Sequence, residues 1–522
     1  MNEMKRKINC LKVLSTASLM ITGTLVSCHT ESKDVIGKIK SKSNILFLFA
    51  DDQRADALGA TGNTYINTPN IDNLAKTGVR FSNCYVMGGH HGAICAPSRA
   101  MLLSGKNLFH VYDVLDGVKT MPMHFAQNGY ETFGTGKWHN GGKTFEASFQ
   151  KGKNVFLGGM CNHYIVPCQD LGPDGKLSEP VNKGYSTDLF AQAAMDFINE
   201  YANGKKEKPF FCYVAFTAPH DPRSPREDYI GMYPDESIPV PGNFMKLHPF
   251  AFDQLDIRDE TLAPWPRTPE IIQASLADYY ALISHLDAKV GEIIETLKKN
   301  SLYDKTIIIY SADNGLAIGS HGLLGKQSLY EDCMKVPLIF TGPGIPKAKV
   351  SDALVYLYDI FPTLSNLSKL PVPEGIDGKD ITPVIRGTAE GVRTSLYTVY
   401  RNTVRAVRTK EWKLIRYPER NYTQLFNLEK DPLEINNLAA RPEYQTKVYE
   451  MMDILKDWYM ATDDTASLTP KTILPLEYDY KKLKQVPDEN QPEYILKKYF
   501  NKVKIYDPVE SGVNERSEKS PY

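Results

Sequence analysis

The sequence has almost no excess charge of either sign. Its 61 Lys and Arg residues oppose 62 Asp and Glu residues, which gives a formal net charge of -1 at pH 7. No long run of one charge appears before the C-terminal tail. Proteins that bind nucleic acid concentrate basic residues to neutralise phosphates. The composition therefore gives no electrostatic case for a nucleic-acid partner.

The sequence also lacks a long uninterrupted apolar run near its N-terminus. The stretch within residues 1–28 follows Lys5, Arg6 and Lys7 and is broken by Ser, Thr and Gly, which favours a secretory signal over a permanent membrane span. It ends in Leu-Val-Ser-Cys, which resembles a bacterial lipobox with Cys28 as the lipidated residue; an ordinary cleaved signal is the alternative. We therefore expect an exported protein, attached to a membrane by lipid on Cys28, in the periplasm or on the outer-membrane surface.

Cysteine is scarce, with eight residues in the chain. Leaving out two in the N-terminal leader and Cys95 leaves an odd number, which excludes a fully paired disulfide framework. Cys161 and Cys168 could pair in an oxidising compartment, whereas Cys212 lies in an apolar run typical of a core strand.

Apolar runs of strand length alternate with helical patterns between residues 43 and 390. The runs NILFLFA, FFCYVAF and TIIIYSA have the length and composition of buried strands. This alternation predicts an α/β fold with a large, mostly parallel sheet flanked by helices. Residues 391–522 differ: short alternating runs predict a smaller α+β subdomain with a short antiparallel sheet, an amphipathic helix and a Tyr- and Lys-rich tail.

Four of the predicted strands end in polar side chains. In open α/β sheets, ligands bind at the carboxyl ends of the strands. Clustered carboxylates repel one another unless a cation lies among them, and oxygen ligands suit Ca²⁺ or Mg²⁺. Asp51-Asp52 or Asp313-Asn314 alone is more often a solvated turn, so the prediction of a metal depends on both pairs lying at the same edge of the sheet. These residues are Asp51 and Asp52, Lys137 and His139, His220, and Asp313 and Asn314.

Cationic side chains fall on the same predicted edge of the sheet. A ring of positive donors around a hard cation is a site for sulfate or phosphate. Cys95 precedes a predicted helix, and a helix N-terminus favours anions. Any one of these cations alone is more often a salt-bridge partner or a buried histidine. The set consists of Arg99, Lys137, His139, His220 and Lys326.

The motif Cys-Ala-Pro-Ser-Arg at residues 95–99, followed by Ala-Met-Leu-Leu-Ser-Gly-Lys, resembles the signature of the type I, formylglycine-dependent sulfatases of the alkaline phosphatase superfamily. The segments NILFLFADD, GKWH, APH, SADNG and GLLGKQSLYE occur in that family's order, and the resemblance spans about residues 43 to 440. It implies a sulfatase catalytic domain over 43–390 that hydrolyses sulfate esters. Because the leader resembles that of exported bacterial enzymes, we expect glycosaminoglycan or other sulfated polysaccharide fragments as substrates.

The resemblance also implies a modified nucleophile. Cys95 would be oxidised to 3-oxoalanine (formylglycine) by a formylglycine-generating maturation enzyme. One hydroxyl of the hydrated aldehyde attacks sulfur, and the other lets the adduct collapse and expel sulfate, so one hard step becomes two easier ones. A serine at this position would leave a stable sulfate ester.

The same resemblance implies roles for the polar residues at the strand ends. Asp51, Asp52, Asp313 and Asn314, with modified Cys95, would bind Ca²⁺ or, as the alternative, Mg²⁺. Arg99 would steady the hydrate, with Lys137 close to it, and His139 would take a proton from the diol as sulfate is expelled. His220 would protonate the departing alcohol, and Lys326 would hold the sulfate.

Residues around these motifs are candidates for substrate contacts. His90 and His91 precede Cys95, and Arg223 and Arg226 follow His220. The arginines could bind the carboxylate or second sulfate of an acidic sugar, which leads us to hypothesise a uronate 2-O-sulfate; loop salt bridges are an equal alternative. For His321, a substrate contact and a purely structural role are likewise both open.

Two other functions stay open at this point. A phosphodiesterase or phosphonate monoester hydrolase of the same superfamily would release phosphate in preference to sulfate. A non-catalytic, glycan-binding lipoprotein would keep the fold and carry an unmodified Cys95.

Overall fold

The computed structural model describes residues 42–470 and 472–500. The expected signal sequence and the lipid attachment at Cys28 lie outside these residues and stay predictions. Among the described helices, none combines the length and the apolar character that a membrane crossing needs.

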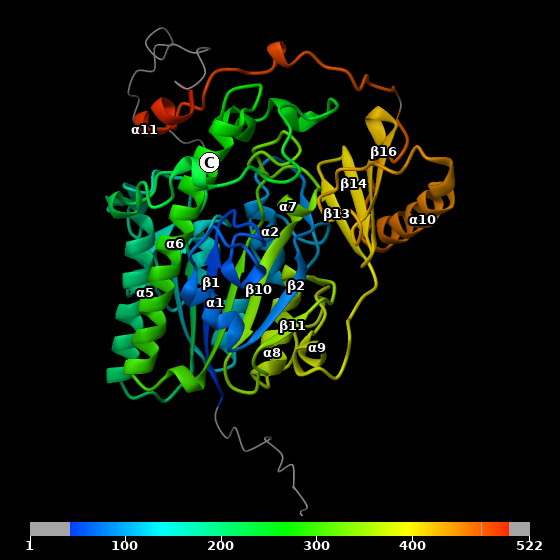
Figure 1. Cartoon of the computed structure of the whole chain (residues 1–522). Helices are drawn as coiled ribbons and strands as arrows, with labels where there is room; N and C mark the ends of the chain where they lie inside the picture. The colour runs from blue at the N-terminus through cyan, green and yellow to red at the C-terminus, as the bar shows by residue number, and fades with distance from the viewer. Residues whose placement is uncertain (1–41, 471, 501–522) are drawn as a thin grey trace, which may run out of the picture. The chain divides into compact units, whose positions relative to one another are not determined.

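A nine-stranded sheet forms the centre of the described chain, in the order β11-β2-β10-β9-β1-β8-β4-β5, with β12 beside β2 (Figure 1). All of its pairs are parallel except those that β10 makes with β9 and β2, which confirms the predicted, mostly parallel sheet. The strands are β1 (Asn44–Ala50), β2 (Val79–Tyr85), β4 (Glu131–Lys137), β5 (Lys151–Phe156), β8 (Phe210–Ala215), β9 (Thr306–Ala312), β10 (Lys335–Thr341), β11 (Lys349–Ser351) and β12 (Val355–Tyr356).

Helices cover this sheet on both faces, because every residue of β1, β8 and β9 is buried. One group of helices packs around α6, and a second group packs around α2. The first comprises α1 (Pro69–Lys76), α5 (Ser186–Asn203) and α6 (Pro269–Lys299); the second comprises α2 (Cys95–Ser104), α3 (Met121–Gln127) and α8 (Ile360–Leu367). Shorter helices are α4 (Gly142–Ser148), α7 (Glu331–Met334), α9 (Thr382–Arg386) and α11 (Glu493–Ile495), and β6 (Val166–Cys168) pairs with β7 (Val181–Lys183).

Helix α6 shows how local sequence sets these boundaries. The Thr268 side chain accepts a hydrogen bond from the Ile271 amide, and Pro269 occupies the first turn, where a missing N–H costs nothing. Lys298 and Lys299 lie in the last turn, where cations interact favourably with the helix dipole.

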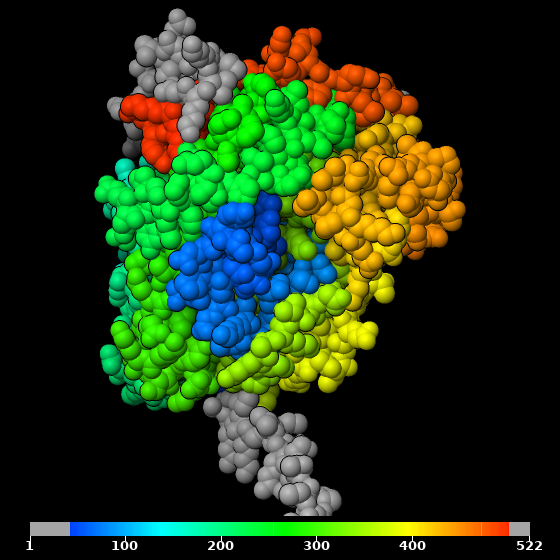
Figure 2. Space-filling view, viewed as in Figure 1, coloured from blue at the N-terminus to red at the C-terminus, as the bar shows by residue number. Residues whose placement is uncertain are grey.

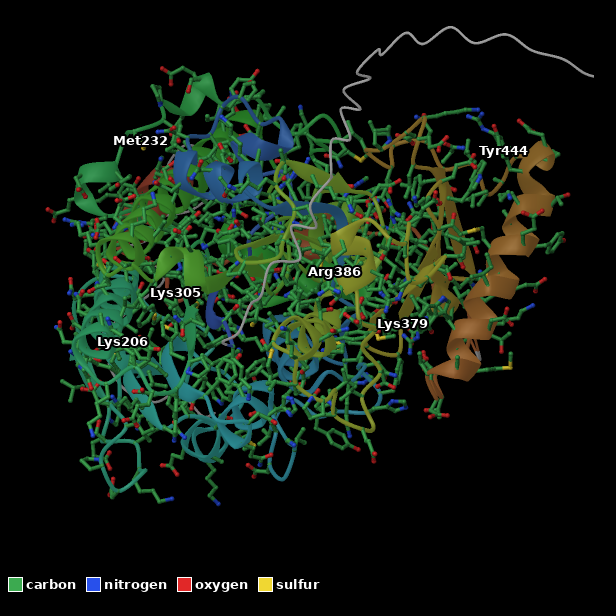
Figure 3. All side chains as sticks on the ribbon, turned by 90° about the horizontal axis from the view of Figure 1, so that it is seen from below. Lys206, Met232, Lys305, Lys379, Arg386 and Tyr444 are labelled. Carbon is green, nitrogen blue, oxygen red and sulfur yellow. The ribbon has the colours of Figure 1, made fainter. Side chains whose placement is uncertain are left out.

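A five-stranded sheet forms the C-terminal subdomain, in the order β16-β15-β14-β13-β3. The strands β13 (Leu396–Tyr400), β14 (Val404–Arg408), β15 (Trp412–Tyr417) and β16 (Tyr422–Asn427) are antiparallel, which confirms the predicted small sheet. The amphipathic helix α10 (Gln445–Ala461) packs on β14 and β15 and lies along the outer edge, with Tyr444 at one end (Figure 3). The fifth strand, β3 (Gly88–Gly89), comes from the segment before Cys95 and pairs in parallel with β13.

The segment after α10 runs back over the larger part of the molecule, as the orange and red trace in Figures 1 and 2 shows. The Tyr478 hydroxyl donates to the His248 carbonyl at 2.7 Å, and the Ala251 amide donates to the Leu476 carbonyl at 2.7 Å. These contacts connect the C-terminal segment to the long loop that follows β8.

The described cysteines are free thiols, so the pairing of Cys161 with Cys168 that was considered from the sequence is not formed. Cys212 is fully buried within β8, which confirms its expected place in the core.

A buried ion pair joins β14 to the start of the C-terminal segment. Arg405 Nε lies 2.5 Å from Asp464 Oδ2, and Arg405 Nη2 lies 3.0 Å from Asp464 Oδ1. Both side chains are 1% exposed, so removing either partner leaves an uncompensated buried charge.

We expect Asp464→Ala to lower the free energy of unfolding by about 3 kcal/mol, because breaking a buried pair by removing one partner is strongly destabilising. The matched control is Asp453→Ala on α10, where the exposed carboxylate pairs with Lys456 and its loss changes stability by less than about 0.5 kcal/mol. Thermal and urea unfolding, followed by circular dichroism, measure the two effects. Equal stability of the two variants would contradict the stabilising role of the buried Arg405–Asp464 ion pair.

Candidate active site

The acidic residues meet because β1 and β9 lie side by side in parallel register. Ala50 pairs with Ala312, so the residues that follow each strand leave the sheet at the same edge. The Asp52 amide donates to Asp313 Oδ1 at 3.0 Å. Asp51, Asp313 and Asn314 are 0% exposed and Asp52 is 1% exposed, so the cluster is closed to bulk solvent.

Each of the three buried carboxylates has a cationic partner. Lys137 Nζ, at the end of β4, donates to Asp51 Oδ2 at 2.6 Å. Arg99 Nε, on α2, donates to Asp313 Oδ2 at 2.9 Å. Lys326 Nζ lies 2.8 Å from Asp52 Oδ1 and 3.1 Å from Asp52 Oδ2. The structure therefore brings together acidic and basic residues from five separate segments.

Cys95 is the first residue of α2 and lies against this cluster. Its Sγ atom is 3.4 Å from His139 Nδ1, 3.5 Å from Lys137 Nζ and 3.9 Å from Lys326 Nζ. Burial raises the pKa of the Cys95 thiol, while the charges of Lys137 and Lys326 act in the opposite direction. An atom at the Sγ position thus has two cationic donors and one imidazole within reach.

The two histidines approach the cluster from different segments. His220 Nδ1 lies 2.8 Å from the Asp221 carbonyl oxygen, so this nitrogen donates and Nε2 faces Lys326 Nζ at 3.1 Å. Burial, followed by the charge of Lys326, lowers the pKa of His220; burial and Lys137 lower the pKa of His139. Both rings are therefore neutral at neutral pH in this state.

The acidic cluster has the character of a cation site. Asp51 Oδ1 and Asn314 Oδ1 are buried and accept no hydrogen bond from the described residues. Burial and the neighbouring Asp313 raise the pKa of Asp51, and burial raises the pKa of Asp52. Ligand atoms of Asp51, Cys95 and Asp313 lie within 4.8 Å of one another. Oxygen donors of this kind fit a hard divalent cation, whose charge would relieve the repulsion.

A cavity of about 450 Å³ opens beside Cys95. It brings the predicted reactive residues together with side chains from the loop after β8 and from the small sheet. Its lining comprises Gly92, Ala93, Cys95, His139, Gly159, Met160, His220, Ile257, Arg258, Asp259, Lys326, Gln327 and Arg401.

The two arginines considered as substrate contacts do not line this cavity. Arg223 is 2% exposed and thus closed to a sugar. Arg226 pairs with Asp188 at 3.1 Å and with Asp228 at 3.2 Å. These two arginines therefore do not support the hypothesis of a uronate 2-O-sulfate, because their nearness in sequence to His220 did not place them in the pocket.

The three histidines considered for substrate contacts also lie outside the cavity lining. His321 is buried and stacks on the Tyr330 ring at 3.7 Å between centroids. His90 Nε2 lies 3.2 Å from the Leu108 carbonyl, and His91 forms an ion pair with Asp113. His90 and His91 precede Cys95 by a few residues, but their rings are occupied by partners on the following loop.

Arg258 and Arg401 line the cavity and were not predicted. Arg258 is the first residue of a short 3₁₀ helix (Arg258–Leu262) in the long segment between β8 and α6, and no periodicity in the sequence predicts its position. Arg401 follows β13, and its position depends on the pairing of β13 with β3. No pattern near either residue in the sequence indicates that it reaches Cys95.

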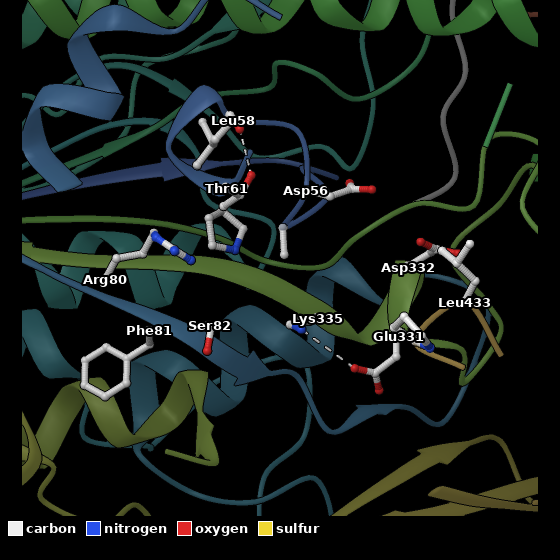
Figure 4. A pocket seen from close by; sticks show the side chains of 13 residues that line it. Asp56, Leu58, Thr61, Arg80, Phe81, Ser82, Glu331, Asp332, Lys335 and Leu433 are labelled. Carbon is white, nitrogen blue, oxygen red and sulfur yellow. Dashed lines mark hydrogen bonds and ion pairs between the residues drawn. The ribbon is translucent and has the colours of Figure 1, made fainter. Parts of the chain in front are cut away.

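A second cavity, of about 410 Å³, shares no lining residue with the first (Figure 4). Asp56, Arg80, Glu331, Asp332 and Lys335 line it, and Lys335 lies 3.9 Å from Glu331. None of the residues of the Cys95 cluster lies there, so the reactive groups belong to the first cavity.

Comparison with known proteins agrees with this geometry. Residues 43–370 match the sulfatase family, and residues 319–460 match the family described as N-sulphoglucosamine sulphohydrolase, C-terminal. An N-acetylglucosamine-6-O-sulfatase of Bacteroides thetaiotaomicron is 27% identical, over 86% of this chain and 91% of its own length.

Solved structures share the fold. One, in complex with D-glucosamine-2-N,6-O-disulfate, has a TM-score of 0.69 and 24% identity, over 81% of this chain and 99% of its own. A phosphonate monoester hydrolase of Agrobacterium radiobacter has a TM-score of 0.64 and 21% identity, over 84% of this chain and 100% of its own. Because sulfate ester hydrolysis and phosphonate monoester hydrolysis both occur on this fold, the fold alone does not distinguish them. The sulfatase family matches more than half of the length of this chain. The chain therefore belongs to the sulfatase family and is a sulfuric ester hydrolase.

Proposed function

We propose that this enzyme hydrolyses sulfate esters of carbohydrates, namely glycosaminoglycan or other sulfated polysaccharide fragments, with formylglycine at position 95 and a bound Ca²⁺. The observation that carries the proposal is the position of Cys95, within 4 Å of Lys137, His139 and Lys326 and beside the acidic cluster. The sulfated-sugar specificity of the relative from Bacteroides thetaiotaomicron supports the substrate class.

Charge balance supports a sulfate ester as the ligand. With every side chain in its ionised form, the three negative charges of Asp51, Asp52 and Asp313 equal the three positive charges of Arg99, Lys137 and Lys326, so the cluster alone is neutral. A divalent cation would leave two positive charges, which matches the charge of departing sulfate. When bound, the ion supplies Lewis-acid polarisation of the sulfate ester.

The chemistry of the donors favours Ca²⁺ over Mg²⁺. Asp51, Asp52, Asp313 and Asn314 offer oxygen atoms, and at most 1% of each residue is exposed. Mg²⁺ usually keeps several of its waters, whereas Ca²⁺ accepts many protein oxygens in flexible geometry. A dry cluster of protein oxygens is therefore the better match to Ca²⁺.

The residues around position 95 can accept the proton of the nucleophilic group there. The Sγ atom of Cys95 stands in for the oxygen of the mature residue, which supplies the nucleophile once oxidised and hydrated. Lys137 Nζ and His139 Nδ1 lie within 3.5 Å of that position. We assign Lys137, with Arg99, to orient the group and His139 to take its proton.

On the leaving-group side, His220 Nε2 and Lys326 Nζ lie 3.1 Å apart and both line the cavity. Their contact lets a proton pass between ammonium and imidazole, so this pair can deliver it to the departing alcohol oxygen. Lys326 Nζ also lies 3.9 Å from Cys95 Sγ, a distance that suits a contact of Lys326 with a sulfate group bound at position 95.

Export and lipid attachment through Cys28 are also part of the proposal and rest on the leader sequence alone. Metabolic labelling with a radioactive fatty acid tests this part: label on the wild-type chain and none on Cys28→Ala is the expected result, and label on both would contradict it.

Sulfate release after co-production with a formylglycine-generating enzyme tests the central function. We expect the mature enzyme to release sulfate from at least one member of a panel of sulfated mono- and disaccharides, measured by ion chromatography. Cys95→Ala should lower the rate at least about a thousandfold, because the nucleophile is lost. Mass spectrometry of the Cys95 peptide verifies maturation. Preferential hydrolysis of a phosphodiester by the mature protein would instead support the phosphonate hydrolase alternative.

Dependence on the leaving group tests the role of His220. We expect His220→Ala to lower kcat/KM about 10²- to 10⁴-fold on a sugar sulfate, because a sugar alkoxide needs a proton as it departs. Hydrolysis of nitrophenyl sulfate, whose phenolate departs unaided, should change much less. His110→Ala, at a partly exposed ring paired with Asp377, is the matched control. Equal losses on both substrates would contradict the assignment of His220 as the acid.

Removal of the metal tests the acidic cluster. We expect Ca²⁺ to raise the Tm of EDTA-treated protein, since ligand at 100 times its Kd stabilises the folded state by about 2.7 kcal/mol. Asp51→Asn should abolish this increment, measured by differential scanning calorimetry. Asp196→Asn, at an exposed carboxylate paired with Lys153, should keep it. An unchanged increment in Asp51→Asn would place the ion elsewhere.

A further inference from the structure

Arg401 reaches the active-site cavity because its backbone is held from two sides. Its amide donates to the Gly89 carbonyl at 2.8 Å, where β13 pairs with β3. Its carbonyl accepts a hydrogen bond from Arg405 Nη1 at 2.7 Å. Because Arg405 is itself fixed by Asp464, this turn has a defined position relative to the segment that leads into Cys95.

The Arg401 guanidinium lies at the cavity without a counter-charge. Nη2 is 3.9 Å from the position that a Cβ on Gly92 would occupy, and the side chain is half-buried. Within residues 42–470 and 472–500, its guanidinium forms no ion pair; its contact is with the Tyr400 ring, 5.4 Å from the centroid. A half-buried cation in a pocket is best satisfied by an anion that arrives with the ligand.

Arg258, the other arginine at the cavity, differs in this respect. It pairs with Asp221, with Asp259 at 3.1 Å and with Asp488 at 3.2 Å. Its charge is therefore neutralised within the protein. Of the two arginines that line the cavity, Arg401 is therefore the one whose charge is available to a ligand.

The remaining charged neighbours of Arg401 do not neutralise it. The His91 ring lies nearby; its hydrogen bond to the Asp113 carboxylate raises the pKa of His91, while the charge of Arg401 opposes that shift. Asp113 is engaged by His91, and Asp259 is engaged by Arg258 and Gln327. This side of the cavity thus presents positive charge to a ligand.

We propose that Arg401 determines specificity by binding a second anionic group, a carboxylate or a further sulfate, on the saccharide whose sulfate ester is cleaved. The inference rests on the proposed function. A guanidinium binds either group through two parallel hydrogen bonds, and partial enclosure strengthens the attraction. Arg401 and Cys95 line the same cavity, whose volume of about 450 Å³ suits a small saccharide. Binding of a carboxylate or second sulfate, predicted from the sequence for Arg223 and Arg226, is thus assigned to an arginine of the C-terminal subdomain.

Arg401 is a substrate-binding residue that does not touch the reacting atoms, so its loss should appear mainly in KM. The test compares the mature enzyme with Arg401→Gln and Arg401→Lys on four substrates. These are a disulfated sugar, a sulfated sugar with a carboxylate, a monosulfated sugar without either group, and nitrophenyl sulfate. Arg386→Gln, at an exposed arginine in the last turn of α9, is the matched control.

We expect Arg401→Gln to lower kcat/KM about 10- to 100-fold on a doubly anionic sugar, which corresponds to the loss of a charge-assisted pair. The change on the monosulfated sugar and on nitrophenyl sulfate should stay below about twofold. Arg401→Lys should recover part of the loss, because it restores the charge without the planar fork. A larger loss with the carboxylate substrate would identify the bound group as a carboxylate, and a larger loss with the disulfated sugar as a sulfate.

Equal effects of Arg401→Gln on singly and doubly anionic substrates would overturn the inference and leave the proposed function intact. Failure of the mature wild-type enzyme to release sulfate from any substrate, with the aldehyde verified, would overturn the proposed function and this inference together.

Discussion

The burial of three carboxylates at the edge of one sheet is the constraint on which the rest of the site depends. Parallel pairing of β1 with β9 forces Asp51, Asp52 and Asp313 together, out of contact with water. Such a cluster is stable only among positive charges. Arg99 and Lys137 lie among these carboxylates for that reason, and they come from two further segments. The same buried carboxylates and cationic side chains that stabilise this part of the fold also provide ligands for a cation and donors for an anionic ester.

A second constraint connects the small sheet to the reactive residue. The two-residue strand β3, Gly88–Gly89, precedes Cys95 by only a few residues and extends the sheet of the C-terminal subdomain. A Cβ on Gly88 would lie 1.9 Å from the Val399 carbonyl oxygen, so this close approach requires glycine. The subdomain is thereby fixed beside the cavity, where it contributes Arg401.

The sequence predicted which side chains lie together at this edge of the sheet, because the ends of neighbouring parallel strands converge. Asp52 and Asp313 needed only the identification of their strands and the rule that ligands bind at the carboxyl ends. The cavity wall could not be predicted in this way. Arg401 depends on the pairing of a Gly-Gly dipeptide that carries no strand pattern, and Arg258 begins a short 3₁₀ helix that no regular sequence pattern predicts. Proximity in sequence misled for Arg223, which the fold buries away from the pocket.

The most direct test of this account is the position of the ion in crystals of the enzyme grown with Ca²⁺, located by anomalous scattering. The account predicts one strong peak within about 2.3–2.6 Å of oxygen atoms from Asp51, Asp52, Asp313 and Asn314. A cluster that remains closed by Lys137 and Lys326, with no peak between the carboxylates, would contradict it.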